Sequence, residues 1–184
     1  MNSQTQIQIP HELFAPAESL HFEGELSCPI LEVGPDSFTF EQPIAWLCDI
    51  SNVGDALLVR GSAHACAQTC CARCLEPCAF DLEGEIEGYY IISDEHQAPD
   101  DLEGDEFEFL SDNQIIDLEP LILAGLRMDV PLQPLCSDDC LGLCPQCGKN
   151  LNSGSCACNP DEAKADDFSK NPFSVLKDYH FEED

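Results

Sequence analysis

The 184-residue chain is long enough for one globular domain, or for a domain with a small appendage. It carries 36 Asp and Glu against 7 Lys and Arg, which gives a formal net charge of −29. This excess of acidic residues argues against direct binding of bare nucleic acid, because phosphates are normally bound by clustered Lys and Arg. It favours a basic protein as partner, although the acids could instead serve only to keep the chain soluble.

The start of the chain offers neither the basic segment nor the apolar segment of a secretory signal peptide. No apolar run reaches the length of a transmembrane helix. We therefore expect a cytoplasmic protein whose 13 cysteines stay reduced. In that compartment, closely spaced cysteines are typical of metal binding rather than of disulfides.

Short alternating segments predict β-strands in the first half of the chain. Residues 7–9 and 38–40 alternate apolar with polar side chains, as half-buried strands do. Residues 46–65 mix apolar residues with turn signals at 52–55, which predicts two further strands.

From Phe80 to Ile92 the alternation becomes strict and predicts one strand with two different faces. The apolar face comprises Phe80, Leu82, Ile86, Tyr90 and Ile92. The opposite face is acidic and comprises Asp81, Glu83, Glu85 and Glu87, which we regard as candidate partner-binding residues. Gly84 and Gly88 lie on the apolar side and indicate a bulge or close packing.

Residues 93–113 carry nine acids and no Lys or Arg, which predicts an acidic loop. The loop could contact a basic protein, but simple solvation is the favoured explanation. We expect Phe107, Phe109 and Leu110 to anchor its far end to the core.

A helix is predicted from Asp117 to Met128, with Asp117 as its cap and Pro120 in its first turn. Its apolar residues cover more than one stripe, which predicts a well-buried helix. They are Leu118, Leu121, Ile122, Leu123, Leu126 and Met128. Pro131 and Pro134 end the helix.

Six cysteines follow within the stretch CSDDCLGLCPQCGKNLNSGSCAC, residues 136–158. Thiolates in a CxxC pair and a nearby CxC pair can complete tetrahedral coordination of one zinc ion. We therefore predict a closed zinc site of Cys144, Cys147, Cys156 and Cys158. A disulfide scaffold or an iron–sulfur cluster remains an alternative.

A second zinc site is predicted from the cysteines left over. Cys71 and Cys74 form another CxxC pair in what looks like a hairpin connection, and Cys136 and Cys140 are spare if the first site is closed. Together these four would fasten the zinc segment to the β domain. The alternative is a single zinc ion drawn from the six C-terminal cysteines, with Cys71 and Cys74 a reduced pair. The other cysteines are expected to behave as small hydrophobic residues: Cys28, Cys48, Cys66, Cys70 and Cys78.

Four motifs in order resemble the YceD-like family of large ribosomal RNA subunit accumulation proteins. They are CARCLEP at 71–77, IIDLEPLILAGLRMDVPL at 115–132, the cysteine stretch at 136–158, and NPFSVLKDY at 171–179. The resemblance implies a cytoplasmic or plastid factor needed for normal levels of large-subunit ribosomal RNA, with no established catalytic activity. In the family that the chain resembles, several genes sit beside the gene of a small, basic large-subunit ribosomal protein, which suggests such a protein as partner by association only.

The tail adds a second candidate partner-binding element. Asn171 can cap a short helix with Pro172 at its first position, and Phe173 and Leu176 would share one face. This segment either docks onto the chain's own core or binds a partner.

These observations predict an α+β fold, a mainly antiparallel β domain with one buried helix and a C-terminal Cys-rich zinc-binding segment. The expected parts are a β-rich domain at 1–135, a zinc-binding segment at 136–158, and a linker with the NPF tail at 159–184. The predicted function is that of a non-enzymatic accessory factor in large ribosomal subunit biogenesis, which contacts a basic ribosomal protein or an assembly intermediate. The alternative is a zinc-ribbon protein that binds RNA directly. A metalloenzyme is disfavoured because the five histidines show no ligand spacing.

Overall fold

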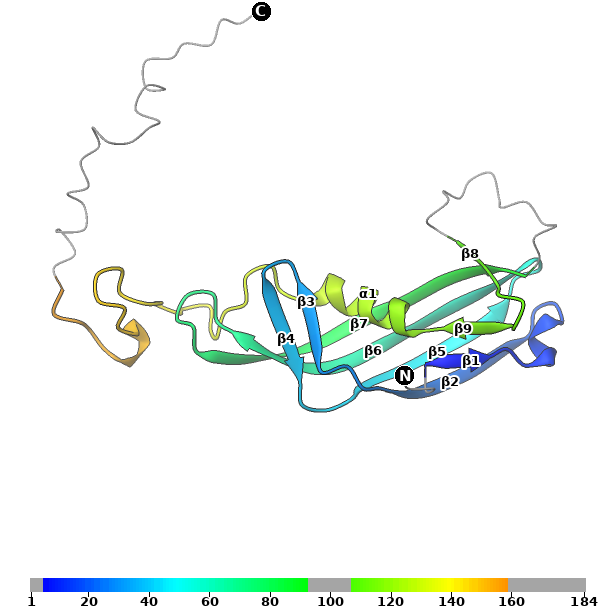
Figure 1. Ribbon diagram of the computed structural model, residues 1–184, viewed down its shortest axis with the longest axis horizontal. Coiled ribbons are helices and arrows are strands. Elements are labelled where there is room, and N and C mark those ends of the chain that lie inside the picture. Colours follow the sequence, from blue (N-terminus) through cyan, green and yellow to red (C-terminus); the bar gives the residue numbers. More distant parts are fainter. Residues whose placement is uncertain (1–4, 93–106, 159–184) are drawn as a thin grey trace, which may run out of the picture.

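A computed structural model describes residues 5–92 and 107–158, which form a mostly antiparallel β structure with one α-helix (Figure 1). This confirms the predicted α+β class. The first elements are β1 (Gln6–Gln8), the 3-10 helix η1 (His11–Phe14), β2 (Ser19–Leu26), β3 (Ile30–Val33), β4 (Asp36–Phe40) and β5 (Ile44–Asn52). They are followed by β6 (Ala56–Cys70), β7 (Pro77–Ile91), β8 (Glu108–Phe109), β9 (Ile115–Asp117), α1 (Glu119–Asp129) and the 3-10 helix η2 (Leu151–Ser153).

The hairpin of β6 and β7 is the longest feature of the main sheet. The two strands pair without interruption from Ala56 opposite Ile91 to Cys70 opposite Pro77. On its other side β6 pairs first with β5 and then, near its end, with β4, so that the order is β2-β5-β6-β4-β3. The two strands predicted around residues 52–55 and the long strand after Phe80 are therefore present.

One face of this sheet carries the core. Side chains of α1, β1, β9 and η1 join those of the sheet in a single hydrophobic cluster that includes Leu13, Ile50, Ile86 and Ile122. In Figure 1, α1 lies along β7, and the β3–β4 hairpin crosses the end of the sheet. No helix in the described residues is long and apolar enough to cross a membrane.

The helix α1 runs antiparallel to β7 and approaches it closely. A Cβ placed on Gly84 would lie 2.5 Å from the backbone nitrogen of Leu126, and one on Gly125 would clash with the carbonyl oxygen of Glu85. Of the two predictions for the glycines, close packing is therefore the one that applies at Gly84, because the β6–β7 register runs through it without a bulge.

Two predictions for the helix are wrong in part. It begins at Glu119 rather than Asp117, although the Asp117 carboxylate still accepts a hydrogen bond of 3.0 Å from the Glu119 backbone N–H. It is also not buried all round: Ile122 and Leu126 are fully covered, but Met128 is 88% exposed. The reason is that only one side of α1 meets β7.

Two further predictions are corrected. Phe109 does not anchor the acidic segment, since it is 49% exposed in β8, whereas Leu110 packs against the core. Cys66 and Cys70 are not small core residues, because they lie on the outward face of β6 and are exposed. Cys48 is buried and Cys28 and Cys78 are half-buried, as expected.

Candidate metal centres

The structure brings eight of the cysteines together in two groups of four. The first group is Cys71, Cys74, Cys136 and Cys140, and the second is Cys144, Cys147, Cys156 and Cys158. Within each group all sulfur atoms lie within 4.8 Å of one another. The groups coincide with the two predicted sites. The first group includes two cysteines of the loop that joins β6 and β7, and the segment 136–158 continues past this loop at one end of the molecule (Figure 1).

The first group joins segments more than sixty residues apart, and the course of α1 explains how. Because α1 runs back along β7, it delivers the residues after it to the loop between β6 and β7. There the backbone N–H of Ala72 donates to the carbonyl of Pro134 at 2.7 Å, and that of Leu143 donates to the carbonyl of Arg73 at 3.1 Å. Cys136 and Cys140 lie between these two contacts and so face Cys71 and Cys74.

Both CxxC pairs adopt the same local backbone. In the first, the N–H of Leu75 donates to the carbonyl of Cys71 at 2.9 Å, and in the second the N–H of Gly148 donates to the carbonyl of Cys144 at 2.8 Å. Leu75 and Gly148 both have a positive φ, of 62° and 71°. This turn points backbone N–H groups at the first sulfur of each pair.

The sulfur separations fit a single metal ion at each site. Four thiolates placed about 2.3 Å from a tetrahedral zinc ion would lie about 3.8 Å from one another. The Sγ–Sγ distances in the structure are 3.7 Å for Cys71 and Cys140, 3.6 Å for Cys74 and Cys136, and 3.4 Å for Cys144 and Cys156. The residues present can therefore hold a metal ion in each group without rearranging the backbone.

Hydrogen bonds lower the pKa of at least one thiol in each group and raise the pKa of others. The N–H of Cys74 lowers the pKa of Cys71 to about 6, and the N–H groups of Cys147 and Gln146 lower the pKa of Cys144 to about 6. The pKa of Cys136 is raised to about 12, chiefly by its hydrogen bond with the Cys140 sulfur. Each group thus has a sulfur, that of Cys71 or of Cys144, whose lowered pKa favours the thiolate form that binds metal.

The two groups differ in burial. Cys71, Cys74 and Cys140 are at most 4% exposed and pack against Leu135 and Leu143, although Cys136 is exposed. In the second group only Cys144 is buried, whereas Cys147 is exposed and the other two sulfurs are half-buried. The first site is therefore the better shielded from water and from chelators.

Two residues that the sequence did not single out support the first site. The Asn152 side-chain amide donates to the Cys140 sulfur at 3.3 Å and lowers the pKa of Cys140. Arg73 donates from Nη1 to the carbonyl of Cys140 at 3.1 Å. Because Asn152 belongs to the loop between the two halves of the second group, it couples the two sites. Neither residue has a spacing signal that would have revealed this role.

The other predicted site residues lie elsewhere. Asp81, Glu83, Glu85 and Glu87 are exposed on the outward face of β7, away from the cysteines. Asn171, Pro172, Phe173 and Leu176 fall outside the described residues.

The fold and the two cysteine groups define an acidic, antiparallel β-sheet protein that could hold metal ions at one end. The sequence pattern of the family described as large ribosomal RNA subunit accumulation protein YceD matches residues 59–179, and the chain belongs to this family. This confirms the resemblance drawn from the motifs. The matched range contains all but the first three residues of β6, together with β7, α1 and all eight clustered cysteines.

Curated relatives agree with this assignment. An uncharacterized protein of Mycobacterium tuberculosis is 35% identical over 105 residues, which cover 56% of this chain and 49% of that protein. An uncharacterized protein of Mycobacterium leprae is 27% identical over 105 residues, covering 55% of this chain and 46% of that one. The large ribosomal RNA subunit accumulation protein YCED homolog 1, chloroplastic, of Zea mays is 35% identical over 57 residues, or 30% of this chain and 20% of that protein.

The chain spans about half the length of the mycobacterial relatives that it matches. No solved structure matches it significantly. The description of the family names the accumulation of large-subunit ribosomal RNA.

Proposed function

We propose that this protein is a non-enzymatic accessory factor in large ribosomal subunit biogenesis, and that it acts by contact with a basic ribosomal protein or an assembly intermediate that displays one. The observation that carries the proposal is family membership over residues 59–179 in a chain whose net charge is −29. The exposed acids of β7 support a protein partner, since they would attract basic protein and repel RNA.

We further propose that each cysteine group holds one zinc ion. Soft thiolate ligands favour zinc among the divalent metals common in cells, and the sulfur separations suit a single ion rather than a larger iron–sulfur cluster. Four sulfurs around zinc leave no open position for substrate, so both sites would be structural. Thiolate sites of this kind persist where cysteines stay reduced, which supports a cytoplasmic location.

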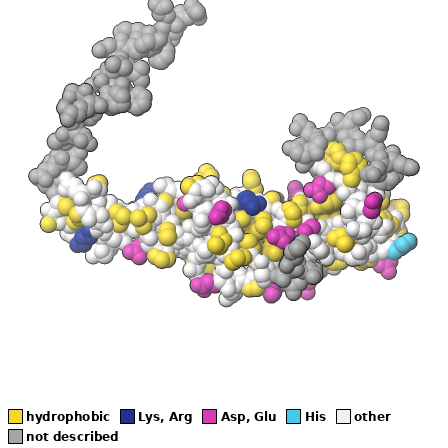
Figure 2. All heavy atoms as spheres, in the orientation of Figure 1, with side chains coloured by type: hydrophobic (Ala, Val, Ile, Leu, Met, Phe, Trp, Pro, Cys, Tyr) yellow, Lys and Arg dark blue, Asp and Glu magenta, His cyan; other side chains and the backbone are white. Residues whose placement is uncertain are grey.

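Direct binding of RNA by the cysteine-rich end is the second candidate. Figure 2 shows few acidic side chains at this end, while they are spread over the rest of the visible face. The basic residues there are Arg73 and Lys149, however, and each already donates to backbone carbonyls, from Nη1 to Cys140 and from Nζ to Ser155. The described part of this end therefore offers no cluster of cations for phosphates, which favours the protein partner.

An affinity pull-down from growing cells tests the proposal. We expect basic large-subunit ribosomal proteins to remain bound after nuclease treatment, identified by mass spectrometry against a mock bait. Recovery that is abolished by nuclease, together with tight binding of purified protein to naked large-subunit RNA at physiological salt, would favour direct RNA binding instead.

A further inference from the structure

The outward face of the main sheet has no layer over it among the described residues. The strands β2, β5, β6 and β7 lie side by side, and their registers place outward side chains in rows. One row runs Glu23, Leu47, Ser62, Glu85. The next runs Glu25, Ala45, His64, Glu83.

Both rows have acids on the two outer strands. The inner strands carry Leu47 and Ala45 on β5 and Ser62 and His64 on β6, and His64 Nε2 lies 3.8 Å from Oε1 of Glu83. Leu47 is 42% exposed at the centre, beside the exposed Ala45. One row further along, Arg60 faces Glu87 with 3.7 Å between Nε and Oε1, so the local charge there is partly balanced. The acids of β2 and β7 therefore flank a short apolar strip of Leu47 and Ala45 on β5, which resembles an interface with an apolar centre and a charged rim.

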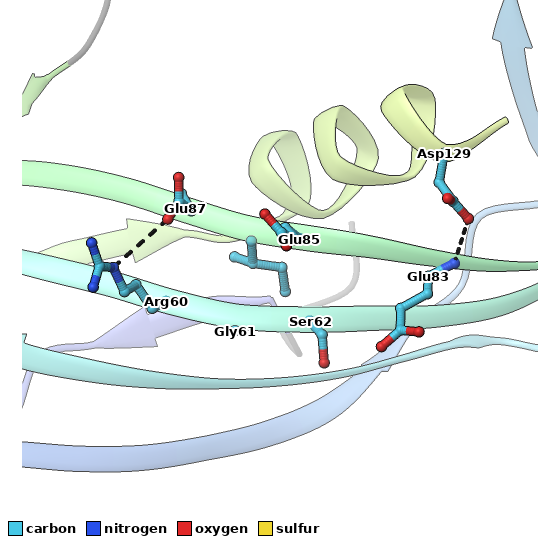
Figure 3. A pocket seen from close by; sticks show the side chains of 8 residues that line it. Arg60, Gly61, Ser62, Glu83, Glu85, Glu87 and Asp129 are labelled. Atoms are coloured by element: carbon cyan, nitrogen blue, oxygen red, sulfur yellow. Dashed lines mark hydrogen bonds and ion pairs between the residues drawn. The ribbon is translucent and has the colours of Figure 1, made fainter.

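Two shallow hollows lie on this face, one over the strip itself and one beside it, toward β7. One is lined by residues that include Glu23, Glu25, Leu47 and His64. The other lies between β6, β7 and the end of α1 and is lined by residues that include Ser62, Glu83, Glu85 and Asp129 (Figure 3). In Figure 3 the Asp129 carboxylate accepts from the Glu83 backbone N–H at 2.8 Å. No described residue pairs with the Glu85 carboxylate, which leaves it available to a cation from outside.

The dimensions of the face select the shape of the occupant. Strands are about 4.8 Å apart, so β2 and β7 are separated by roughly 14 Å. An α-helix with its side chains is about 10–12 Å wide, and it would fit between the two acidic strands with its axis over β5 and β6.

We infer that this face binds a basic amphipathic helix of a partner protein. An apolar stripe of the helix lies on Leu47 and Ala45, and Lys or Arg side chains on its flanks reach Glu23 and Glu25 on one side and Glu83 and Glu85 on the other. The inference rests on the proposed contact with a basic protein and assigns that contact to the outward face of the main sheet. A second copy of the chain is a poor occupant, because two chains that each carry a net charge of −29 repel each other.

The test uses a designed Leu/Lys amphipathic helical peptide of about 18 residues, roughly five turns, and a scrambled peptide of the same composition. The face variant carries Glu23→Gln, Glu25→Gln, Glu83→Gln and Glu85→Gln. Its matched control carries Glu12→Gln, Glu18→Gln, Glu32→Gln and Glu41→Gln, which removes as many exposed charges elsewhere. Zinc content and circular dichroism verify that both variants fold.

At low salt we expect the face variant to raise the Kd for the helical peptide at least about tenfold. The control variant should raise it no more than about threefold, because surface charges act mainly over a Debye length. The scrambled peptide should bind more weakly to the wild type. Leu47→Glu should weaken binding although it adds a negative charge, since it interrupts the apolar strip. Equal losses in the face and control variants, stronger binding by Leu47→Glu, or no binding of the helical peptide would each overturn the inference.

The pull-down separates this inference from the proposed function. If the face variant recovers the same ribosomal proteins as the wild type, the partner contact stands and its assignment to this face is wrong. If the wild type recovers none, the proposed contact itself fails, whatever the peptide does.

Discussion

At the scale of single residues, the two CxxC turns place different amino acids in the same left-handed backbone conformation. Leu75 and Gly148 follow the second cysteine of each pair with φ of 62° and 71°. A left-handed backbone costs a residue with a Cβ about 1–2 kcal/mol, whereas glycine adopts it freely. Leu75 recovers little of this cost through packing, because it is 63% exposed.

We therefore predict that Leu75→Gly raises the free energy of unfolding by about 0.5–1 kcal/mol, once the greater flexibility of glycine in the unfolded chain is subtracted. Gly148→Ala should lower it by about 1 kcal/mol. Urea unfolding of the zinc-loaded protein measures both. Leu141→Gly is the matched control, since Leu141 is also exposed but has no positive φ, and its replacement should destabilise. If Leu75→Gly destabilises as Leu141→Gly does, Leu75 is not strained.

At the scale of elements, the contact of α1 with β7 depends on glycines that face each other. We predict that Gly84→Ala lowers the free energy of unfolding by about 2–3 kcal/mol, because its Cβ would lie 2.5 Å from the Leu126 nitrogen and 2.6 Å from the Gly125 carbonyl carbon. These are backbone atoms, which cannot rotate away. The measurement is the urea midpoint of unfolding.

The control for this prediction is Glu85→Ala, on the same strand but with its side chain on the opposite, exposed face. It should change stability by no more than about 0.5 kcal/mol. Similar effects of the two substitutions would show that α1 moves easily on β7, contrary to the close packing of the glycines.

Much of this element structure is readable from the sequence. The alternation after Phe80 predicts β7 and its two faces, because the strand is covered on one side only. The same pattern is present in β2, where Leu20, Phe22 and Leu26 point inward. Because Gly24 interrupts the alternation, the sequence pattern does not predict this strand. The fold requires glycine at this position, because a Cβ on Gly24 would lie 2.6 Å from the Trp46 ring that covers it.

The cysteine groups are predictable in part. The spacing of the cysteines in the sequence predicts the second group. The first group follows by elimination, because Cys136 and Cys140 are left over and can join Cys71 and Cys74. What spacing does not contain is the antiparallel return of α1 along β7, which brings these two pairs together. The support from Asn152 is equally absent from any local pattern, because it depends on how the second loop folds back on the first site.

At the scale of the whole molecule, the metal-binding end and the sheet have separate clusters of buried residues. The main hydrophobic cluster contains none of the eight clustered cysteines, and Cys71, Cys74 and Cys140 form a small cluster of their own. Loss of metal should therefore unfold the segment 136–158 and leave the sheet intact. Structural zinc contributes on the order of 10 kcal/mol to small metal-dependent folds, far more than the few hydrogen bonds that hold this segment.

The last prediction is that the folded chain holds about two zinc ions and releases them in two steps. Elemental analysis should return about two ions per chain, with one lost in Cys158→Ser and the other in Cys71→Ser, and both retained in the control Cys66→Ser, which alters an exposed cysteine outside both groups. A chromogenic chelator should remove the ion of the second group first, because three of its four sulfurs are accessible, whereas three of the four in the first group are buried. The fast phase should vanish in Cys158→Ser and the slow phase in Cys71→Ser, while the β signal in circular dichroism persists throughout. A single ion that survives Cys71→Ser would contradict the two-site arrangement, and a slow phase lost in Cys158→Ser would contradict the assigned order.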